Sequence, residues 1–165
     1  MTKDSLIYVS KIVEKYKIGG RVLDVGARQV NYPCTDGDRN KIIYDSCPKR
    51  FFDDYTGLDM IDGRNVDVVA SSHKIPLKDR VFDCVMTIDM LEHDDDPFQT
   101  AKEMMRVLKK EGYAIVIAPF YFPVHNYPDD YFRYTTSGLK LLFKDLECLE
   151  EEMTVHHSRV VMKKI

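Results

Sequence analysis

Apolar residues follow two patterns that alternate along the chain. Near the start they recur with the spacing of one helix face, and Gly19-Gly20 follows them, which predicts an amphipathic helix ended by a glycine cap. The next apolar segment is a short continuous run from Val22 to Val25, closed by Gly26. Such a run predicts a strand buried on both faces of a parallel sheet. The helical positions are Leu6, Val9, Ile12, Val13 and Tyr16.

The strand pattern returns in later runs, each bounded by Gly, Pro or charged residues. Two closing runs, Cys148 to Val155 and Arg159 to Ile165, are separated only by His156-His157-Ser158. That separation is too short for a crossover helix, so we expect these two runs to pair antiparallel. The other expected strands are Tyr55 to Leu58, ending at Asp59, then Val66 to Ala70, Phe82 to Ile88 and Tyr113 to Ala118.

Two later helices carry capping signals. Asp96 suits an N-cap, Pro97 the first helical position and Gln99 the partner position of a capping box, with Gly112 just beyond the basic end. Thr135 or Thr136 can cap the second helix. The apolar faces are expected at Phe98, Ala101, Met105 and Leu108 in the first helix, and at Leu139, Leu142, Phe143 and Leu146 in the second.

Strands that alternate with helices predict an α/β fold. We expect a doubly wound, mostly parallel, Rossmann-like sheet that is covered on both faces and ends in an antiparallel hairpin. A length of 165 residues fits one domain, spanning 1–165. The segment from Arg28 to Asp54 is polar and irregular, and only Lys41 to Phe52 offers room for a short helix.

Composition narrows the possible partners. Hydrophobic residues make up 44% of the chain, charged residues 31%, and the net charge is -3, which argues against nucleic acid as the main partner. The chain shows neither a signal peptide nor a run of about 18 apolar residues, so we expect a cytoplasmic protein without a membrane span. Cys34, Cys47, Cys84 and Cys148 form no C-x-x-C pair and are expected to be reduced, although Cys34 and Cys47 flank a polar loop and can approach each other.

In a doubly wound sheet, ligands bind at the carboxyl ends of the strands. The first strand carries Asp24 and leads into small residues at Gly26 and Ala27, where the backbone can approach a ligand closely, although a packed strand and its turn would look the same. Asp59 ends the next strand, where it can accept two hydrogen bonds from a ribose diol or simply open a solvated turn. Met60 beside it suits an adenine face or the core.

The order and spacing of these pieces resemble the class I S-adenosylmethionine-dependent methyltransferases, in particular a type 11-like branch with a leucine-glutamate-histidine signature after the fourth strand. The stretch from His125 to Thr135 also resembles a segment of methyltransferases associated with cell-surface glycan synthesis. The pieces that carry the first resemblance are Val22-Leu23-Asp24-Val25-Gly26, Tyr55-Thr56-Gly57-Leu58-Asp59, Ile75-Pro76-Leu77, Val81-Phe82-Asp83-Cys84-Val85, Leu91-Glu92-His93, Arg106-Val107-Leu108-Lys109 and Gly112-Tyr113.

This resemblance implies S-adenosylmethionine as the cofactor and assigns it a set of residues. Asp24 and Gly26 would lie at the methionine end, and Asp59 would hold the ribose hydroxyls. The family's turn usually carries two or three glycines, whereas here Ala27 and Arg28 follow Gly26, so Arg28 either pairs with the cofactor carboxylate or crowds the site. Ser71, Ser72 and His73 would border the adenine, and Ala27, Arg28, Met60 and Asp89 complete the predicted cofactor-binding set.

Two histidines are the candidate catalytic residues, His93 and His125. His93 follows the strand that ends near the expected methyl group, where its imidazole can act as a base, orient the acceptor or bond a neighbouring loop. The acidic run from Asp89 to Asp96 also contains metal-ligand chemistry. Because Asp96 is explained as a helix cap and acids before a helix are favoured by its dipole, we expect no metal.

The segment from Phe120 to Tyr134 is the expected acceptor lid. Its candidate substrate-binding residues are Tyr127, Asp130, Tyr131 and Arg133. A structural alternative is that the aromatic residues pack over the sheet edge while Arg133 pairs with Asp129 or Asp130. The sequence gives no indication of the oligomeric state.

Together these patterns favour an O- or N-methyltransferase for a small-molecule acceptor, with a sugar or glycan intermediate as the leading candidate. A nicotinamide-dependent oxidoreductase is disfavoured because G-x-G-x-x-G is absent and Asp59 lies 59 - 24 = 35 positions after Asp24, where about 20 is usual. A regulatory protein that binds the cofactor without catalysis remains the alternative, supported by the glycine-poor turn.

Overall fold

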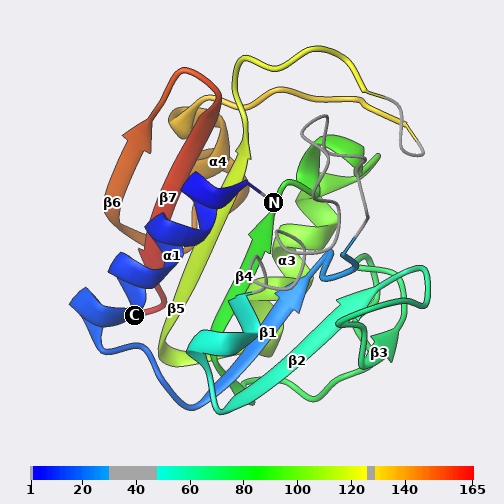
Figure 1. The fold of residues 1–165 in the computed structure, drawn as a ribbon. Helices are drawn as coiled ribbons and strands as arrows, with labels where there is room; N and C mark the ends of the chain where they lie inside the picture. Colours follow the sequence, from blue (N-terminus) through cyan, green and yellow to red (C-terminus); the bar gives the residue numbers. More distant parts are fainter. Residues whose placement is uncertain (1, 30–47, 126–128) are drawn as a thin grey trace.

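The computed structural model describes residues 2–29, 48–125 and 129–165. Their strands form one seven-stranded sheet (Figure 1). The neighbouring pairs from β3 to β5 are parallel, whereas β7 runs antiparallel to both β5 and β6. The predicted doubly wound sheet with a closing antiparallel hairpin is therefore confirmed. Across the sheet the order is β3 (Val68–Val69), β2 (Asp54–Asp59), β1 (Arg21–Val25), β4 (Phe82–Ile88), β5 (Leu108–Pro119), β7 (His157–Lys163) and β6 (Glu147–Met153).

The strand bounds differ from the predicted ones mainly at β5. This strand begins at Leu108, so Gly112 lies inside it and is not the cap of the preceding helix. An irregular register beside β4 accounts for the extension, because Phe82 pairs with Leu108 while Cys84 pairs with Tyr113. The polar residues between those two pairs gave no strand signal in the sequence.

The first helix, α1 (Lys3–Tyr16), begins and ends with defined caps. The Thr2 side chain accepts a hydrogen bond from the Ser5 backbone N–H. At the other end Lys17 takes the left-handed conformation, with φ of 52°, and its N–H donates to Glu14. The predicted glycine cap at Gly19-Gly20 is thus wrong: lysine adopts the left-handed turn, and the glycines lie in the connection to β1.

Two further helices follow the predicted caps. In α3 (Pro97–Val107) the Asp96 side chain accepts from the Gln99 N–H, and in α4 (Thr136–Leu142) the Thr135 side chain accepts from the Gly138 N–H. The buried face of α3 is offset from the predicted one, since Phe98 is 59% exposed. The buried positions of α3 are Pro97, Thr100, Ala101, Met104 and Val107.

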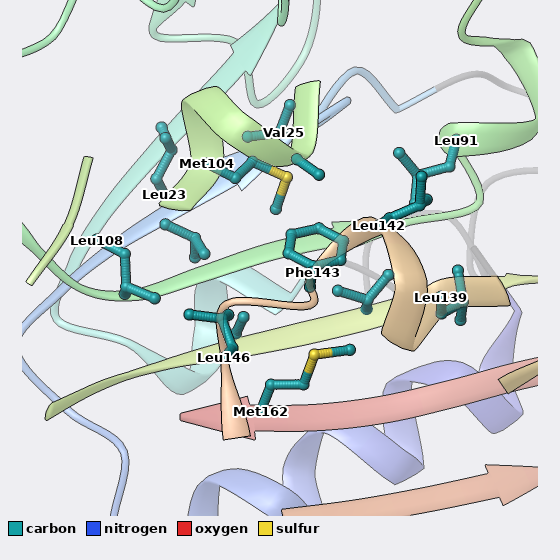
Figure 2. Close-up of a cluster of buried hydrophobic side chains, with 14 of the residues drawn as sticks. Leu23, Val25, Leu91, Met104, Leu108, Leu139, Leu142, Phe143, Leu146 and Met162 are labelled. Carbon is teal, nitrogen blue, oxygen red and sulfur yellow. The ribbon is translucent and has the colours of Figure 1, made fainter. Parts of the chain in front are cut away.

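Helices cover both faces of the sheet, with α1 on one face and α3 and α4 on the other (Figure 1). Alternate residues of the strands therefore enter two separate cores. Val22 packs with α1 residues, whereas Leu23 and Val25 pack with α3 and α4. Figure 2 shows the second core, in which Phe143 lies among side chains from helices and strands; it includes Leu23, Val25, Met104, Leu108, Leu139, Leu142, Leu146 and Met162.

Two short 3-10 helices complete the described elements, η1 (Pro48–Phe51) and η2 (Leu91–His93). In the described ranges, no helix is both long and apolar enough to cross a membrane. Cys84 is buried and Cys148 is exposed, and both are free thiols. Cys34, Cys47 and most of the predicted helix from Lys41 to Phe52 lie outside the described residues.

Candidate active site

The turns that follow β1 and β2 are joined at the carboxyl edge of the sheet. The backbone N–H groups of Gly26 and Ala27 both donate to the Leu58 carbonyl oxygen, at 2.8 and 3.0 Å. Gly26 has φ of +84°, and a Cβ there would meet the Met90 side chain at 2.4 Å. Glycine is therefore required at Gly26 both by its backbone conformation and by the packing of Met90 over it.

Asp59 fastens the same two turns with its side chain. One carboxylate oxygen accepts from the Arg28 N–H at 3.1 Å and the other from the Ile61 N–H at 3.0 Å. Asp59 remains partly exposed, and Met60 beside it is 65% exposed. Each carboxylate oxygen has more than one acceptor direction, so the group can still receive hydrogen bonds from a ligand.

Close backbone packing holds the two turns in register. A Cβ at Gly57 would lie 1.8 Å from the Asn65 carbonyl oxygen, so no other residue fits there without moving the backbone. The Asn65 side-chain amide donates to the Gln29 side chain at 3.2 Å. The Arg28 side chain lies close to the same two turns, because a Cβ added to Gly63 would be 3.1 Å from it. The Arg28 side chain thus lies against Gly63, in the turn that follows β2.

Asp24 is the buried acid of this edge. It is 5% exposed and accepts a hydrogen bond from the Tyr55 hydroxyl at 2.7 Å. Burial raises the pKa of Asp24 to about 6, against the opposing effect of the Tyr55 hydrogen bond. Asp24 is therefore a mostly ionised but readily protonated group at neutral pH.

Ser71, Ser72 and His73 follow β3 and are tied to the start of α3. The Thr100 hydroxyl donates to the Ser72 hydroxyl at 2.8 Å, and the Gln99 side chain donates to the His73 carbonyl oxygen at 2.8 Å. Nε2 of His73 lies 2.6 Å from the Asp94 carboxylate, and this hydrogen bond raises the pKa of His73. These bonds fix the segment that the sequence predicts at the adenine.

The turn after β4 is strained and rich in buried polar groups. Asp89 has φ of 53°, and its carboxylate lies 3.1 Å from Nε2 of His157 in β7. Glu92, in η2, has a side chain only 2% exposed. Burial, and then the nearby Asp89 charge, raise the pKa of Glu92 to about 8. Perturbed carboxyl groups of this kind are typical of functional sites.

The two predicted catalytic histidines meet beside this turn. The ring centroids of His93 and His125 are 4.9 Å apart and the rings are nearly perpendicular, at 81°. Nδ1 of His93 bonds the Asp129 carbonyl oxygen, and the Glu92 carbonyl accepts from the Tyr131 N–H at 2.7 Å. The segment after β5, which arches beyond the end of the sheet in Figure 1, is therefore anchored on η2.

Arg133 holds that segment together. Its guanidinium makes a two-pronged ion pair with Asp130, whose side chain is fully buried, and donates to the carbonyl oxygens of Phe122 at 3.1 Å and Pro123 at 3.0 Å. Hydrogen bonding from Arg133 lowers the pKa of Asp130 well below its usual range. The predicted structural pairing of Arg133 is thus confirmed, with Asp130 as the partner. Tyr131 is half exposed at the segment's surface, and Tyr127 lies outside the described residues.

Comparison with known proteins identifies the family. Residues 24–116, more than half of the chain, match the methyltransferase-domain family. The chain belongs to this family. No curated protein matches the sequence.

Solved structures with the same fold include several methyltransferases. An S-adenosylmethionine-dependent methyltransferase from Aquifex aeolicus is 17% identical, with a TM-score of 0.65 over 95% of this chain and 89% of that one. The 1,6-didemethyltoxoflavin-N1-methyltransferase of Burkholderia thailandensis, solved with bound 1,6-didemethyltoxoflavin and S-adenosylhomocysteine, is 13% identical, with a TM-score of 0.69 over 96% of this chain and 77% of that one. The cyclase SpnF is 14% identical, with a TM-score of 0.67 over 96% and 81%.

The family match and these neighbours support S-adenosylmethionine as the cofactor. The residues at the carboxyl edge suit it in part: Asp59 keeps acceptor capacity for hydroxyl groups, and Met60 offers an exposed apolar surface. The amides of Gly26 and Ala27 are already used by Leu58, so they are not available to the methionine end. Arg28 is then the candidate for the cofactor carboxylate.

Several contacts in the candidate site were not indicated by the sequence. Tyr55 and His157 had no assigned role, yet they bond Asp24 and Asp89. Glu92 had no assigned role beyond the acidic run and the leucine-glutamate-histidine signature, although it is buried, whereas Asp95 and Asp96 of the same run are exposed. The alternation of β2 could have identified Tyr55, since it lies opposite Val22 in the register and on the same face as Asp24. His157 is adjacent to Asp89 only through the β5–β7 pairing.

Proposed function

We propose that the chain transfers a methyl group from S-adenosylmethionine to an oxygen or nitrogen atom of a small-molecule acceptor, with a sugar or glycan intermediate as the leading candidate. The observation that carries the proposal is the position of Asp59. Its carboxylate joins the turns after β1 and β2 at the carboxyl edge of the sheet and still has acceptor capacity for a diol.

The cofactor side of the site is formed by β1, β2 and the segment after β3. Asp59 accepts the ribose hydroxyls, Met60 and the segment Ser71 to His73 border the adenine, and Arg28 pairs with the carboxylate. Asp24, Gly26 and Ala27 shape the floor, and Asp89 lies at the end of β4. When bound, S-adenosylmethionine supplies an electrophilic methyl group, so the protein has to align an acceptor and exclude water.

The acceptor side is formed by η2 and the segment from Phe120 to Tyr134. Exposed aromatic rings at Tyr121, Phe122 and Tyr131 suit the flat apolar faces of a sugar ring. His93 and His125 lie together at the base of this segment, where an imidazole can accept the acceptor's proton. Asp130 and Arg133 act through the shape of the segment, because each is engaged by the other.

Cofactor binding and turnover test the proposal separately. Calorimetry with S-adenosylmethionine should detect binding to the full chain, and Asp59→Asn should weaken it about tenfold to a hundredfold, because a charge-assisted hydrogen bond contributes about 1.5 to 3 kcal/mol. Asp62→Asn, an exposed acid in the same turn, is the matched control and should retain the parent affinity. Equal affinities in a folded Asp59 variant would remove Asp59 from the site.

Formation of S-adenosylhomocysteine with candidate acceptors then distinguishes an enzyme from a regulatory binding protein. Small sugars and sugar nucleotides with free hydroxyl or amino groups are the first acceptors to use. Tight cofactor binding without turnover on any acceptor would favour the binding protein. That alternative has structural support in the Gly26 and Ala27 amides, which are engaged within the protein, and in SpnF, a cyclase with the same fold.

A further inference from the structure

Three side chains with metal-binding chemistry meet where η2 contacts the segment after β5. Glu92 and His93 belong to η2, and His125 comes from the segment. One ligand atom from each side chain lies within 4.8 Å of the other two. Residues brought together from separate segments are a more specific signal than a run of acids along the chain, which is usually a solvated surface.

Hydrogen bonds select the same tautomer in both histidines. Nδ1 of His93 bonds the Asp129 carbonyl oxygen, which can only accept, so this nitrogen carries the proton. Nδ1 of His125 lies 3.2 Å from the Pro123 carbonyl oxygen and 3.2 Å from the Asp130 carboxylate. In both neutral rings Nε2 therefore presents a lone pair. A carbonyl or carboxylate on one ring nitrogen is the usual way in which a protein orients a metal-ligating histidine.

Glu92 provides a second, independent observation. Its side chain is 2% exposed, and one carboxylate oxygen lies 3.8 Å from Nε2 of His93. The other oxygen, Oε2, is buried and has no hydrogen-bond partner among the residues that the structure describes. Leaving a buried polar atom without a partner costs free energy, and a cation bound beside it would remove that cost.

We propose that Glu92, His93 and His125 bind a divalent transition-metal ion such as zinc, cobalt or manganese. Two imidazoles and one carboxylate favour such an ion over magnesium or calcium, which prefer oxygen ligands alone. Ligand atoms about 2.1 Å from a zinc ion lie roughly 3.4 Å apart, so the three ligand atoms, now within 4.8 Å of one another, have to approach by at most about 1.4 Å on binding. This proposal departs from the expectation, made from the sequence, that no metal is bound, while Asp96 keeps its role as the α3 cap.

Three protein ligands leave a coordination position open. An acceptor hydroxyl in that position would be held in place and made more acidic by the cation, which is what O-methylation needs from a catalyst. With the ion bound, the two imidazoles act as ligands, and the cation takes over from them the activation of the acceptor hydroxyl. This use of the ion rests on the proposed function. The binding of the ion does not, and the experiment measures binding directly.

Titration of the chelator-treated full chain with Co²⁺ tests the site through the visible absorption of the bound ion. We expect one equivalent to bind, without the near-ultraviolet band that thiolate ligands produce. His93→Ala and His125→Ala should each weaken binding at least about tenfold. His156→Ala, which removes an exposed histidine outside the cluster, is the matched control and should bind as the parent does.

A second group, His73 with Asp94 and Asp95, also has ligand atoms close together, so His73→Ala is measured in parallel. Loss of binding in His73→Ala but not in the other two variants would overturn the proposal, as would failure of the parent to bind Co²⁺. X-ray absorption of the Co²⁺ complex of the parent chain tests the ligands without relying on any variant that unfolds. We expect two imidazole ligands. A coordination shell of sulfur atoms, or of oxygen atoms alone, would contradict the assignment. Binding with the expected ligands but without methyl transfer would count against the proposed function only.

Discussion

Asp59 illustrates how one side chain serves both the fold and the proposed site. The sequence left two readings for it, a ligand for ribose hydroxyls and an acid that opens a turn. The turn reading is confirmed, because both oxygens accept backbone N–H groups. The ligand reading remains a prediction, and the geometry is compatible with it because those bonds use only part of the acceptor capacity of the carboxylate.

Asp24 makes stability depend on pH. Its folded pKa of about 6 lies above the usual value for Asp of about 3.9, so the folded chain keeps a proton that the unfolded chain releases in this window. The contribution of Asp24 to stability therefore falls as pH rises from about 4 to about 6 and is constant above that. Asp24→Asn removes this contribution, so the stability of the variant relative to the parent should rise with pH across the window.

Urea unfolding at pH 4.5, 5.5 and 7 measures this difference, and subtracting the parent cancels the titration of groups that the substitution leaves unchanged. Asp53→Asn, at an exposed acid before β2, is the control and should show no such trend. A relative stability of Asp24→Asn that is constant or falls with pH would mean that Asp24 is ionised throughout the window.

The segment between β5 and α4 is held by a few strong bonds and little apolar burial. Asp130 pairs with Arg133 and also accepts from the His125 N–H at 2.7 Å, so this pair connects the two described parts of the segment. Arg133→Ala would leave the buried Asp130 carboxylate without its cation, a change that strongly destabilises the local structure. Exposed rings at Tyr121, Phe122 and Phe132 contribute less to its stability.

We therefore expect Arg133→Ala to accelerate amide hydrogen exchange in residues 120–125 and 129–134 and to lower methyl transfer at least about tenfold, or ~1.4 kcal/mol. Affinity for S-adenosylmethionine should stay within a few-fold of the parent, because the predicted cofactor-binding residues lie outside this segment. Lys140→Ala, which removes an exposed ion pair between Lys140 of α4 and Glu151 of β6, provides the control. Normal exchange together with the parent transfer rate would show that the segment does not depend on this pair.

Local signals predicted the starts of elements better than their faces and ends. The cap at Asp96, and the one at Thr135 as one of two candidates, are predictable because each needs only its own side chain and the next backbone N–H groups. The apolar face of α3 was offset because Met104 and Met105 both fit a helical stripe, and only packing against the sheet decides which is buried. The cap at Lys17 was missed because a lysine in the left-handed conformation has no sequence signature.

Across the whole molecule, alternating strands and helices are enough to predict the layered fold, since each apolar run must be covered on both faces. The candidate site depends on contacts between distant segments, and these were predicted less well. His93 and His125 were each identified as candidates, but their meeting depends on the anchoring of Tyr131 on Glu92 and on the Asp130–Arg133 pair. The sequence indicates the Arg133 pair as one of two alternatives, but nothing in the local pattern indicates that the Tyr131 N–H donates to the Glu92 carbonyl oxygen.

The core beneath α4 joins the parallel half of the sheet to the closing hairpin, and Phe143 is its central side chain (Figure 2). Phe143 is fully buried among residues of α3, α4, β5 and β7. Phe143→Ala should lower the free energy of unfolding by about 3 to 5 kcal/mol, from lost burial and the cavity left behind. Phe98→Ala makes the same chemical change on the exposed side of α3 and should cost no more than about 0.5 kcal/mol. Urea unfolding measures both, and a larger loss in Phe98→Ala would mean that α3 buries the face that the sequence pattern predicts instead of the face seen in the structure.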